Sequence, residues 1–470
     1  WEKATPPVSS LPSGTARRLA VLPLANLSAD PQDEYFADGL TEEIISELSK
    51  VPGLRVIART SVMRFRGSTK GVSEIGKELR VGTIIEGSVR RAGSRIRVTA
   101  QLIDSSTEEH RWSEKYDREL VDVFAIQSEI AKEVSAALNI ALPSTPPARR
   151  RPPPNPAAFR SYLRGRYLWN RRSDEQVRAA LGAFEEALRL DPQFAEASSG
   201  IADCYTILVD RGWMSASEGE PKAKAAAQRA IQLDETNGEA HASLALLLDR
   251  NYQWAEAERE YERAIELNPM YASAHQWYYM HLMTCGRKAE AAGELDRAEE
   301  ADPLSPIILF HRAYFTWITG TDAEAVAAWN RATEVGGDLD FTGLYKLAFY
   351  VSKSMRAEAI DLARKLTSVG LRTYGEVTPA MIDALLGEPE KAYRELEALS
   401  AAEKGHYTPS VGKAWVYGIL GDADRFFEWL FRSADERSRS PLEFVSLPIF
   451  EKMRADPRFQ EYLRRCGLAG

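Results

Sequence analysis

Two segments of equal length and similar sequence decide the fold: WAEAEREYERAIELNP at 254–269 and KAEAAGELDRAEEADP at 288–303. The tripeptide Ala-Glu-Ala recurs every 34 residues, at Ala255, Ala289, Ala323 and Ala357. A second column of alanines has the same period, at Ala264, Ala298 and Ala332. A fixed period of this length, holding two short helical segments, is typical of stacked helical hairpins.

The small and cyclic residues of this pattern have physical roles. Helices approach one another closely only where side chains are small, and a larger side chain at Ala264 or Ala298 would overpack the contact, at a cost of roughly 1–3 kcal/mol. Pro269 and Pro303 follow these alanines by five residues. Because proline cannot continue a helix, the pattern predicts that the second helix of each hairpin ends just before its proline.

This stretch resembles the tetratricopeptide (TPR) repeat. Gly238 matches the first position of that family, and Ala257, Ala264 and Pro269 match its small, small and proline columns. Four consecutive repeats agree in register, starting at Gly238, Ala272, Pro306 and Asp340. The resemblance implies a right-handed superhelix with a concave groove that binds a partner, and it implies no chemistry.

The repeat register extends in both directions. Earlier repeats start at Ser161 and Ala195, and looser ones start near Tyr374 and Tyr407, which gives about eight. We therefore expect an all-α TPR superhelix over residues 158–440. Residues 441–470 are expected to form capping helices, because the last repeat would otherwise expose its apolar face.

The sequence pattern of residues 17–141 predicts one α/β domain. In the segment 95–103, Ile96, Val98, Ala100 and Leu102 alternate with polar residues, which predicts a strand with one buried and one solvated face. The other expected elements are strands at 19–24, 54–58 and 83–90, helices at 41–50, 72–79 and 123–142, and a possible strand at 110–116.

Several strings in this region resemble the TolB amino-terminal-like domain: AVLPLANLS (20–28), EYFADGLTEEIISEL (34–48), IIEGSVRRAGSRIRVTAQLID (84–104) and HRWSEKYDREL (110–120). In bacterial signalling proteins this domain usually lies between a membrane helix and TPR repeats, with a cytoplasmic effector such as a kinase, a cyclase or a DNA-binding domain upstream. The resemblance implies an extracytoplasmic, periplasmic module, tethered to the membrane through a segment before Trp1. A cytoplasmic location is the alternative.

Two Pro-rich stretches separate these parts. Residues 1–16 (WEKATPPVSSLPSGTA) predict a flexible tether, and residues 142–157 (LPSTPPARRRPPPNPA) predict a semi-rigid linker. The chain has a net charge of −8, and residues 173–470 are acidic overall. Because phosphate contacts need clustered Lys and Arg, we expect this region to bind no nucleic acid. No run of 18 apolar residues is present.

A basic surface precedes the acidic repeats. Its arginines are Arg160, Arg164, Arg166, Arg171 and Arg172, interleaved with Tyr162, Tyr167 and Trp169. The surface would contact an anionic membrane or an acidic partner. Alternatively, these arginines are solvated and pair with carboxylates of the later repeats.

The motifs of common enzymes are missing. The sequence contains no GxxxxGK[ST], HExxH, GxSxG or kinase catalytic string, so we predict no catalytic residue, no cofactor and no metal. His241 and His275 lie one period apart, which is compatible with a metal pair but favours a structural aromatic position. The three cysteines, Cys204, Cys285 and Cys466, are too scattered for a disulfide framework.

The concave groove is the main candidate site. In the TPR family, five positions of each first helix face the groove, and the apolar and aromatic content at these positions rises toward the C-terminal side. The predicted lining is Leu246, Arg250, Gln276, Met280, Met283, Phe310, Tyr314, Trp317, Ile318, Phe341 and Leu344. Alternatively, the chain fills its own groove, by tight winding or with the terminal cap.

These patterns lead to three hypotheses. The first is a non-enzymatic sensor or scaffold module of a signalling protein, with a protein or peptide ligand in the groove. The second is a cytoplasmic regulatory arm that acts by self-association, as a homodimer. The third is an enzyme in the α/β domain, which would require a buried cluster of titratable groups with strongly altered pKa values.

Overall fold

The computed structural model describes residues 17–30, 33–93, 95–119, 123–140, 155–171, 173–211, 213–337, 341–369, 375–402, 410–437 and 441–468. The predicted tether at 1–16 and most of the predicted linker lie outside these ranges. By their internal contacts, the residues divide into two units. Unit 1 comprises residues 1–200, 266–272 and 300–304, and unit 2 comprises 201–265, 273–299 and 305–470.

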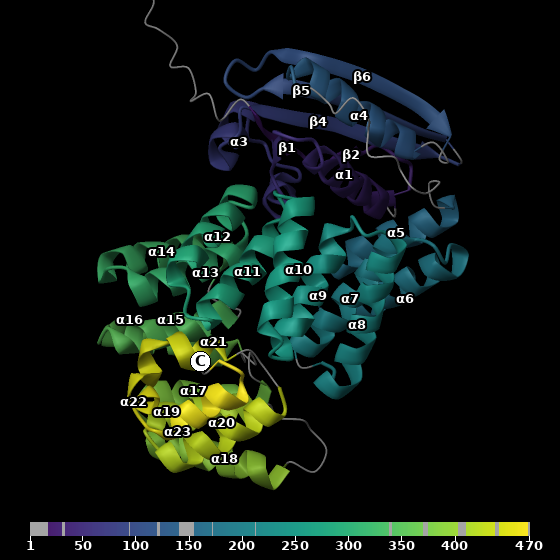
Figure 1. Ribbon diagram of the computed structural model, residues 1–470. Coiled ribbons are helices and arrows are strands. Elements are labelled where there is room, and N and C mark those ends of the chain that lie inside the picture. Colours follow the sequence, from purple (N-terminus) through teal and green to yellow (C-terminus); the bar gives the residue numbers. More distant parts are fainter. Residues whose placement is uncertain are drawn as a thin grey trace, which may run out of the picture. The chain divides into compact units, whose positions relative to one another are not determined.

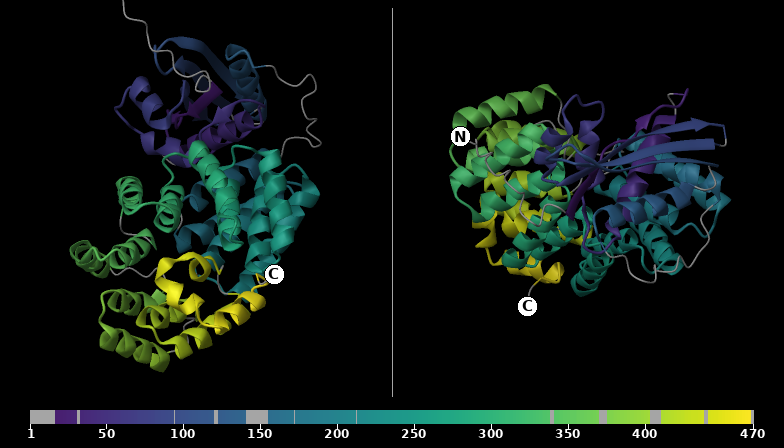
Figure 2. Two further views of the ribbon diagram at one scale, coloured as in Figure 1. Left: turned by 60° about the vertical axis from the view of Figure 1, so that its left-hand side comes forward. Right: turned by 90° about the horizontal axis from the view of Figure 1, so that it is seen from above.

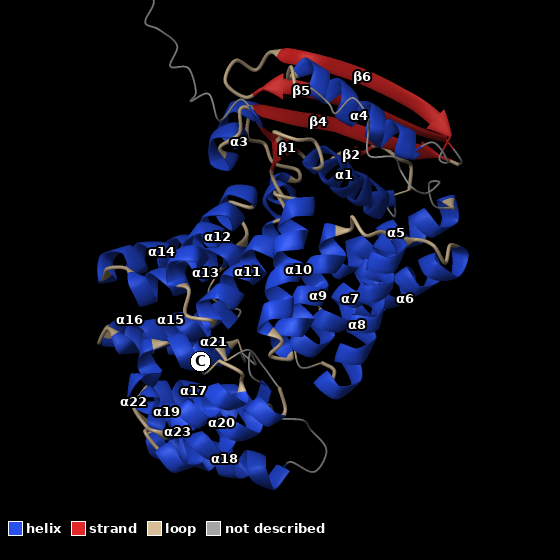
Figure 3. Cartoon of the chain, in the orientation of Figure 1, coloured by secondary structure: helices blue, strands red, loops and turns tan. Residues whose placement is uncertain are grey.

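The strands drawn in red in Figure 3 form a mixed sheet in unit 1. Their bounds are β1 Arg18–Val21, β2 Ala25–Asn26, β3 Arg55–Val56, β4 Thr83–Ala92, β5 Arg95–Asp104 and β6 His110–Glu119. The order is β3-β1-β4-β5-β6, and β2 also pairs with β4. Pairings of β1 and β2 are parallel, whereas β4, β5 and β6 form an antiparallel meander.

The predicted hairpin of β4 and β5 is confirmed, with Val89 opposite Val98. Strand β6 continues the meander and places Tyr116 opposite Val98. The alternating residues Ile96, Val98 and Ala100 are all buried, as their period of two predicts. Strand β2 was not predicted, because two residues are too few to show a periodic pattern.

Four α-helices and one short 3-10 helix among the described residues of unit 1 accompany the sheet. They are α1 Glu34–Ser49, α2 Arg59–Val62, η3 Met63–Phe65, α3 Val72–Leu79 and α4 Val123–Ala137. Helix α1 begins seven residues before the predicted position of Thr41. Its added turns bury Phe36, Ala37 and Leu40, so the apolar stripe of the helix extends further than the sequence pattern suggested.

The described residues form eight helical hairpins that follow along the chain, where the fold prediction is about eight (Figure 1). The first four hairpins are α5 Pro156–Trp169 and α6 Asp174–Leu190, α7 Ala195–Asp210 and α8 Ala216–Leu233, α9 Gly238–Arg250 and α10 Trp254–Leu267, and α11 Ala272–Thr284 and α12 Lys288–Ala301. The next four are α13 Pro306–Thr319 and α14 Asp322–Gly336, α15 Phe341–Ser352 and α16 Arg356–Ser368, α17 Thr378–Leu385 and α18 Pro389–Ala402, and α19 Ser410–Leu420 and α20 Ala423–Asp435, with η5 Gly375–Val377 before α17.

The repeat columns act as the sequence predicts. Helices α10 and α12 each end two residues before their prolines, Pro269 and Pro303. Ala264 and Ala298 are fully buried. In unit 1, a Cβ atom on Gly165 would come within 2.5 Å of the Phe184 ring, so only glycine permits that contact.

The C-terminal segment folds back within unit 2 (Figure 2). Its elements are α21 Leu442–Ser446, η6 Pro448–Phe450, α22 Glu451–Arg454 and α23 Arg458–Arg465. Helix α23 packs on α20, and η6 contacts α15 and α19. At the end of the chain, Trp254 Nε1 donates a hydrogen bond to the carbonyl of Cys466, at 2.8 Å. The C-terminal segment thus reaches a hairpin some two hundred residues earlier.

Candidate functional site

The aromatic part of the predicted groove lies in the core of unit 2. Phe310, Tyr314 and Trp317 on α13 and Leu344 on α15 are all at most 4% exposed. Phe310 and Tyr314 both contact the ring of Tyr345 edge-on, and Trp317 contacts Phe349 in the same way. In this structure these four side chains are therefore core residues, and they do not line an open groove.

The first element of the C-terminal segment, α21, contacts this cluster at Tyr314 and Tyr345. The hydroxyl groups of Tyr314 and Ser446 are 2.8 Å apart. The buried carboxylate of Glu443 accepts hydrogen bonds from the Tyr345 hydroxyl and from Trp415 Nε1, the second at 2.7 Å. Both Ser446 and Glu443 belong to α21. At these positions, the alternative in which the chain fills its own groove describes the structure.

The remaining predicted groove residues are divided between buried and half-buried. Arg250 is 6% exposed and pairs with Glu220 at 3.0 Å and with Asp210 at 3.3 Å. Gln276 and Met283 are also buried, whereas Leu246, Met280 and Ile318 are half-buried. The side chain of Phe341 lies outside the described ones. Of the predicted set, the half-buried residues are the ones that a partner can reach.

Repeat register relates these residues to one another. Leu246, Met280 and Tyr314 occupy the same position in consecutive repeats, 34 residues apart. Tyr314 contacts the C-terminal segment, through Ser446. Leu246 and Met280 are half-buried. The same position is therefore occupied in one repeat and accessible in the two before it.

The two histidines of equal register each pair inside their own hairpin. His241 Nδ1 lies 2.5 Å from a carboxylate oxygen of Glu260, and His275 Nδ1 lies 2.6 Å from Glu294. Both pairs join the two helices of a hairpin across a separation of 19 residues. No group of three His, Cys, Asp or Glu side chains suited to a metal ion occurs among the described residues. The geometry supports the structural interpretation of these histidines.

A third histidine forms a denser network. His281 Nδ1 on α11 lies 2.7 Å from Asp249 Oδ1 on α9, and the Tyr261 hydroxyl donates to Asp249 at 2.9 Å. Burial would lower the pKa of His281, but the hydrogen bond and charge of Asp249 outweigh burial and raise the pKa to about 10. Cys285 Sγ is 3.9 Å from the other ring nitrogen. Sequence reasoning missed this network because its members are far apart in the repeat register.

His311 on α13 is the opposite case. It is 5% exposed, and its Nδ1 has no hydrogen-bond partner among the described residues. Burial lowers its pKa to about 3. The ring packs between the aromatic rings of Tyr279 and Phe310. His311 is therefore a neutral core residue at ordinary pH.

The predicted basic surface is only partly a surface. Arg166 on α5 is largely buried and donates to Glu42 on α1 at 2.8 Å, a partner in the α/β part. Burial would raise the pKa of Glu42, but Arg166 and Arg59 lower it overall. Arg164 and Arg171 are exposed, and Arg160 is half-buried. Arg172 lies outside the described residues.

The carboxylate of the neighbouring residue, Glu43, has a shifted pKa as well. Burial, together with the charge of Glu196, raises the pKa of Glu43 to about 8. Adjacent residues of α1 thus have pKa values shifted in opposite directions. Both side chains are half-buried, because α1 packs on α5 in unit 1.

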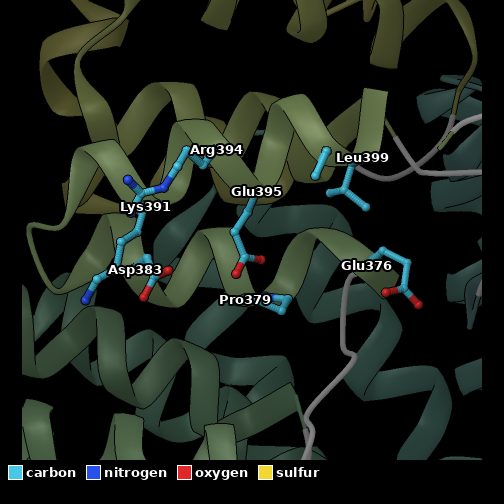
Figure 4. Close-up of a pocket in the computed structure, with 8 residues that line it drawn as sticks. Glu376, Pro379, Asp383, Lys391, Arg394, Glu395 and Leu399 are labelled. Atoms are coloured by element: carbon cyan, nitrogen blue, oxygen red, sulfur yellow. The ribbon is translucent and has the colours of Figure 1, made fainter. Parts of the chain in front are cut away.

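A depression of about 600 Å³ opens on helices α17 and α18. Figure 4 shows Asp383 and Pro379 from α17 facing Lys391, Arg394 and Glu395 from α18. Burial raises the pKa of Asp383. This depression could not be predicted from the sequence, because its mixed charges are those of an ordinary exposed helix pair.

None of the helices in the described ranges combines the length and the apolar composition that a membrane span requires.

Comparisons with known proteins place this geometry in context. No family model matches the chain. The chain is 38% identical over 261 residues to "Putative adenylate cyclase 3" of Rhizobium meliloti (strain 1021), a match that covers 54% of this chain and 44% of that protein. The chain therefore spans less than half the length of this relative.

Solved structures of similar fold are repeat proteins. The human IFIT1 dimer with PPP-AAAA shares 15% identity and has a TM-score of 0.49, with 94% of this chain and 97% of that chain covered. YrrB, a TPR protein with an unusual peptide-binding site, shares 21% identity and has a TM-score of 0.26, with 38% of this chain and 87% of that chain covered.

Proposed function

We propose that the chain is a non-enzymatic protein-binding scaffold in a signalling protein, and that it binds a protein or peptide partner along its repeats. The observation that carries this proposal is the register of Leu246, Met280 and Tyr314. The last of these positions already binds a segment of polypeptide, because Tyr314 contacts α21 through Ser446. The equivalent residues in the two preceding repeats, Leu246 and Met280, are half-buried. A partner would bind at these positions.

The chemistry of the accessible positions suits an apolar partner. Met280 has a flexible thioether side chain, which adapts to apolar surfaces of differing shape. Gln276 lies beside it, with its Nε2 3.9 Å from Met280 Sδ. Arg250 is held by Glu220 and Asp210 and is not available as a charge for the partner. We therefore expect recognition through apolar contacts with a few polar hydrogen bonds.

The signalling part of the proposal is supported by the sequence relative. Its name, "Putative adenylate cyclase 3", is that of a protein more than twice as long as the matched stretch. We propose that residues 17–141 are a TolB-like domain, and that the module belongs to a membrane-anchored protein whose catalytic domain lies outside this chain. An extracytoplasmic location goes with this proposal. Alkaline phosphatase fused after residue 468 of the full-length protein would be active in cells if the module is extracytoplasmic. The fusion would be inactive if the module is cytoplasmic.

The partner surface can be tested with a photo-crosslinking amino acid placed at Met280. Ala289 is the matched control, because it lies on the second helix of the same hairpin and is exposed. In cells that express the full-length protein, the variant at 280 is expected to form a discrete protein adduct, identifiable by mass spectrometry. The variant at 289 is expected to form none. Equal adducts at both positions, or adducts at neither, would contradict the proposed surface.

Self-association remains the competing function, and sedimentation of the purified chain separates it from the scaffold. A scaffold that binds another protein is expected to sediment as a monomer over a hundredfold range of concentration. A mass that doubles with concentration would favour the regulatory-arm hypothesis. If Met280→Lys then restored the monomer, the same surface would be the dimer contact.

A further inference from the structure

Three side chains in the third and fourth hairpins of the chain form a connected row. Asp249 on α9 is hydrogen-bonded to His281 on α11 at 2.7 Å, and the second ring nitrogen of His281 is 3.9 Å from Cys285 Sγ. Asp249 and His281 are buried, at 7% and 2% exposure. Cys285 is half-buried, directly after the last residue of α11. A thiol next to an imidazole that a carboxylate orients is the arrangement that activates nucleophilic cysteines.

We propose that Cys285 is a nucleophilic thiol, activated by His281 and Asp249, and that it is a site of covalent modification by small peroxides. This proposal concerns the chemistry of one hairpin and does not depend on the scaffold function. The partial exposure of Cys285 admits a small molecule, while the buried carboxylate and imidazole are kept from solvent.

The groups around His281 favour its charged form. Asp249 supplies the nearest negative charge, and Tyr261 donates a hydrogen bond to the same carboxylate, which fixes its orientation. Glu258 on α10 also interacts with His281 electrostatically and is itself paired with Arg287 and Tyr278. The rings of Trp254, Tyr261 and Tyr278 pack around the imidazole. The positive charge on His281 is therefore held next to the sulfur.

The oxidation of Cys285 needs no reactant other than the peroxide. Cys285 first gives its thiol proton to His281, and the thiolate sulfur then attacks one oxygen of hydrogen peroxide, so that an S–O bond forms and the O–O bond breaks. The sulfur is oxidised to sulfenic acid, and the peroxide is reduced to hydroxide. The hydroxide leaves with the bonding electron pair and takes a proton from the His281 imidazolium, which gives water. With iodoacetamide as the probe, an S–C bond forms and iodide leaves in the same way.

The chain supplies its own controls. Cys204 and Cys466 are fully buried, and burial raises the pKa of Cys466 to about 11. In the folded protein both are expected to resist the reagents that modify Cys285. Their modification would report unfolding, and so they serve as a check on every variant.

The experiment compares alkylation rates at pH 7, measured for each cysteine by peptide mass spectrometry on the whole chain. Cys285 in the folded protein is expected to react about tenfold faster than the same cysteine in the guanidinium-unfolded chain, because unfolding removes the activating imidazole. His281→Gln is expected to slow Cys285 by about tenfold, and Asp249→Asn is expected to slow it less. Hydrogen peroxide followed by dimedone is expected to label Cys285 in the wild type only.

The outcome that overturns the proposal is equally direct. If Cys285 reacted only because it is exposed, its alkylation rate would be unchanged or higher in His281→Gln. The rate would also be no faster in the folded chain than in the unfolded chain. If His281→Gln fails to fold, Cys204 and Cys466 become reactive in that variant. The comparison of folded and unfolded wild type then decides the question, since it needs no substitution.

Discussion

Two pairs of neighbouring repeats share a register but have different cores. In residues 238–301, the contacts across the helices include three histidine–carboxylate pairs, His241–Glu260, His275–Glu294 and His281–Asp249. In residues 306–368, the buried side chains include the aromatic residues Phe310, Trp317, Trp329 and Phe349. His311, the one histidine among the described residues of this second pair, has no partner at its Nδ1.

The comparison shows that the alanine columns determine the spacing of the helices and leave the chemistry of the core open. Ala257, Ala264, Ala291 and Ala298 in the first pair, and Ala325, Ala332 and Ala359 in the second, are all buried to a similar extent. Between these fixed contacts, a polar and an apolar core are both compatible with the period of 34 residues. The polar core depends on satisfied hydrogen bonds, whereas the aromatic core depends on close packing.

The largest expected effect concerns the aromatic core. Trp329→Ala removes an indole that is 1% exposed, and we expect the free energy of unfolding to fall by roughly 3–5 kcal/mol. Trp277→Ala on α11, where the side chain is half-buried, is the matched control and is expected to cost about half as much. Chemical denaturation of both variants measures the difference. A larger cost at Trp277 would contradict the assignment of the packing core to the second pair.

The polar core is tested by Asp249→Asn, which keeps the shape of the side chain but removes the charge that pairs with His281. Breaking a buried pair of this kind is expected to cost roughly 3 kcal/mol at neutral pH. The raised pKa of His281 gives the sign of the pH dependence. Its stabilising contribution is fully present below about pH 6.5 and is lost as the pH rises through about 10.

Denaturation at pH 6 and pH 9 therefore separates the wild type from this variant. The wild type is expected to lose stability between the two values, and Asp249→Asn is expected to lose less. An equal loss in both proteins would show that the pair with Asp249 does not control the titration of His281.

A smaller effect is expected where the second helices begin. At the same register, α14 starts with a capping box of Thr321 and Glu324, whereas α12 starts with an ion pair of Arg287 and Glu290. Thr321→Ala is expected to cost about 1 kcal/mol, since it leaves a backbone N–H of the first turn unsatisfied. Thr319→Ala, an exposed threonine nearby, is the control and is expected to be nearly neutral. Thermal melts of both variants would show whether the cap contributes.

The smallest effect at neutral pH is expected for His311→Leu. Replacing a buried, unpartnered imidazole with an apolar side chain of similar size is expected to change the free energy of unfolding by no more than about 1 kcal/mol. Because the pKa of His311 is lowered to about 3, the wild type loses stability as the pH falls from about 6.5 toward that value. The variant is expected to lose less between pH 7 and pH 4. If the imidazole had a hydrogen-bond partner, His311→Leu would instead cause a large loss of unfolding free energy at pH 7.

The local features of the fold could be predicted from the sequence. The starts of the hairpins at Gly238, Ala272 and Pro306 coincide with observed helix starts, because small residues and prolines act over one or two turns. The β4–β5 hairpin followed from alternation in the same way. The early start of α1 could not be predicted, since the turn before Thr41 mixes polar and apolar residues and is buried only through its tertiary contacts.

The candidate site was less predictable, because its decisive contacts are distant in the sequence. Tyr314 meets Ser446 across 132 residues, and Arg166 meets Glu42 across 124. The periodic pattern placed Tyr314 on the correct helix and at the correct register position. It contains no information on what packs against that position. The Asp249–His281–Cys285 row has a similar origin, since Asp249 and His281 come from different hairpins.

The hydrogen bond from Trp254 to the backbone carbonyl of Cys466 has a consequence for how unit 2 folds. A linear repeat array can grow from any point, because each repeat needs only its immediate neighbours. Here the end of the chain is fixed to a side chain 212 residues earlier, so one set of contacts cannot form until the intervening hairpins are in place. A large loop must then be closed, which raises the contact order and slows folding. Unit 2 is accordingly expected to unfold in one cooperative transition, with no stepwise loss of hairpins from its C-terminal end.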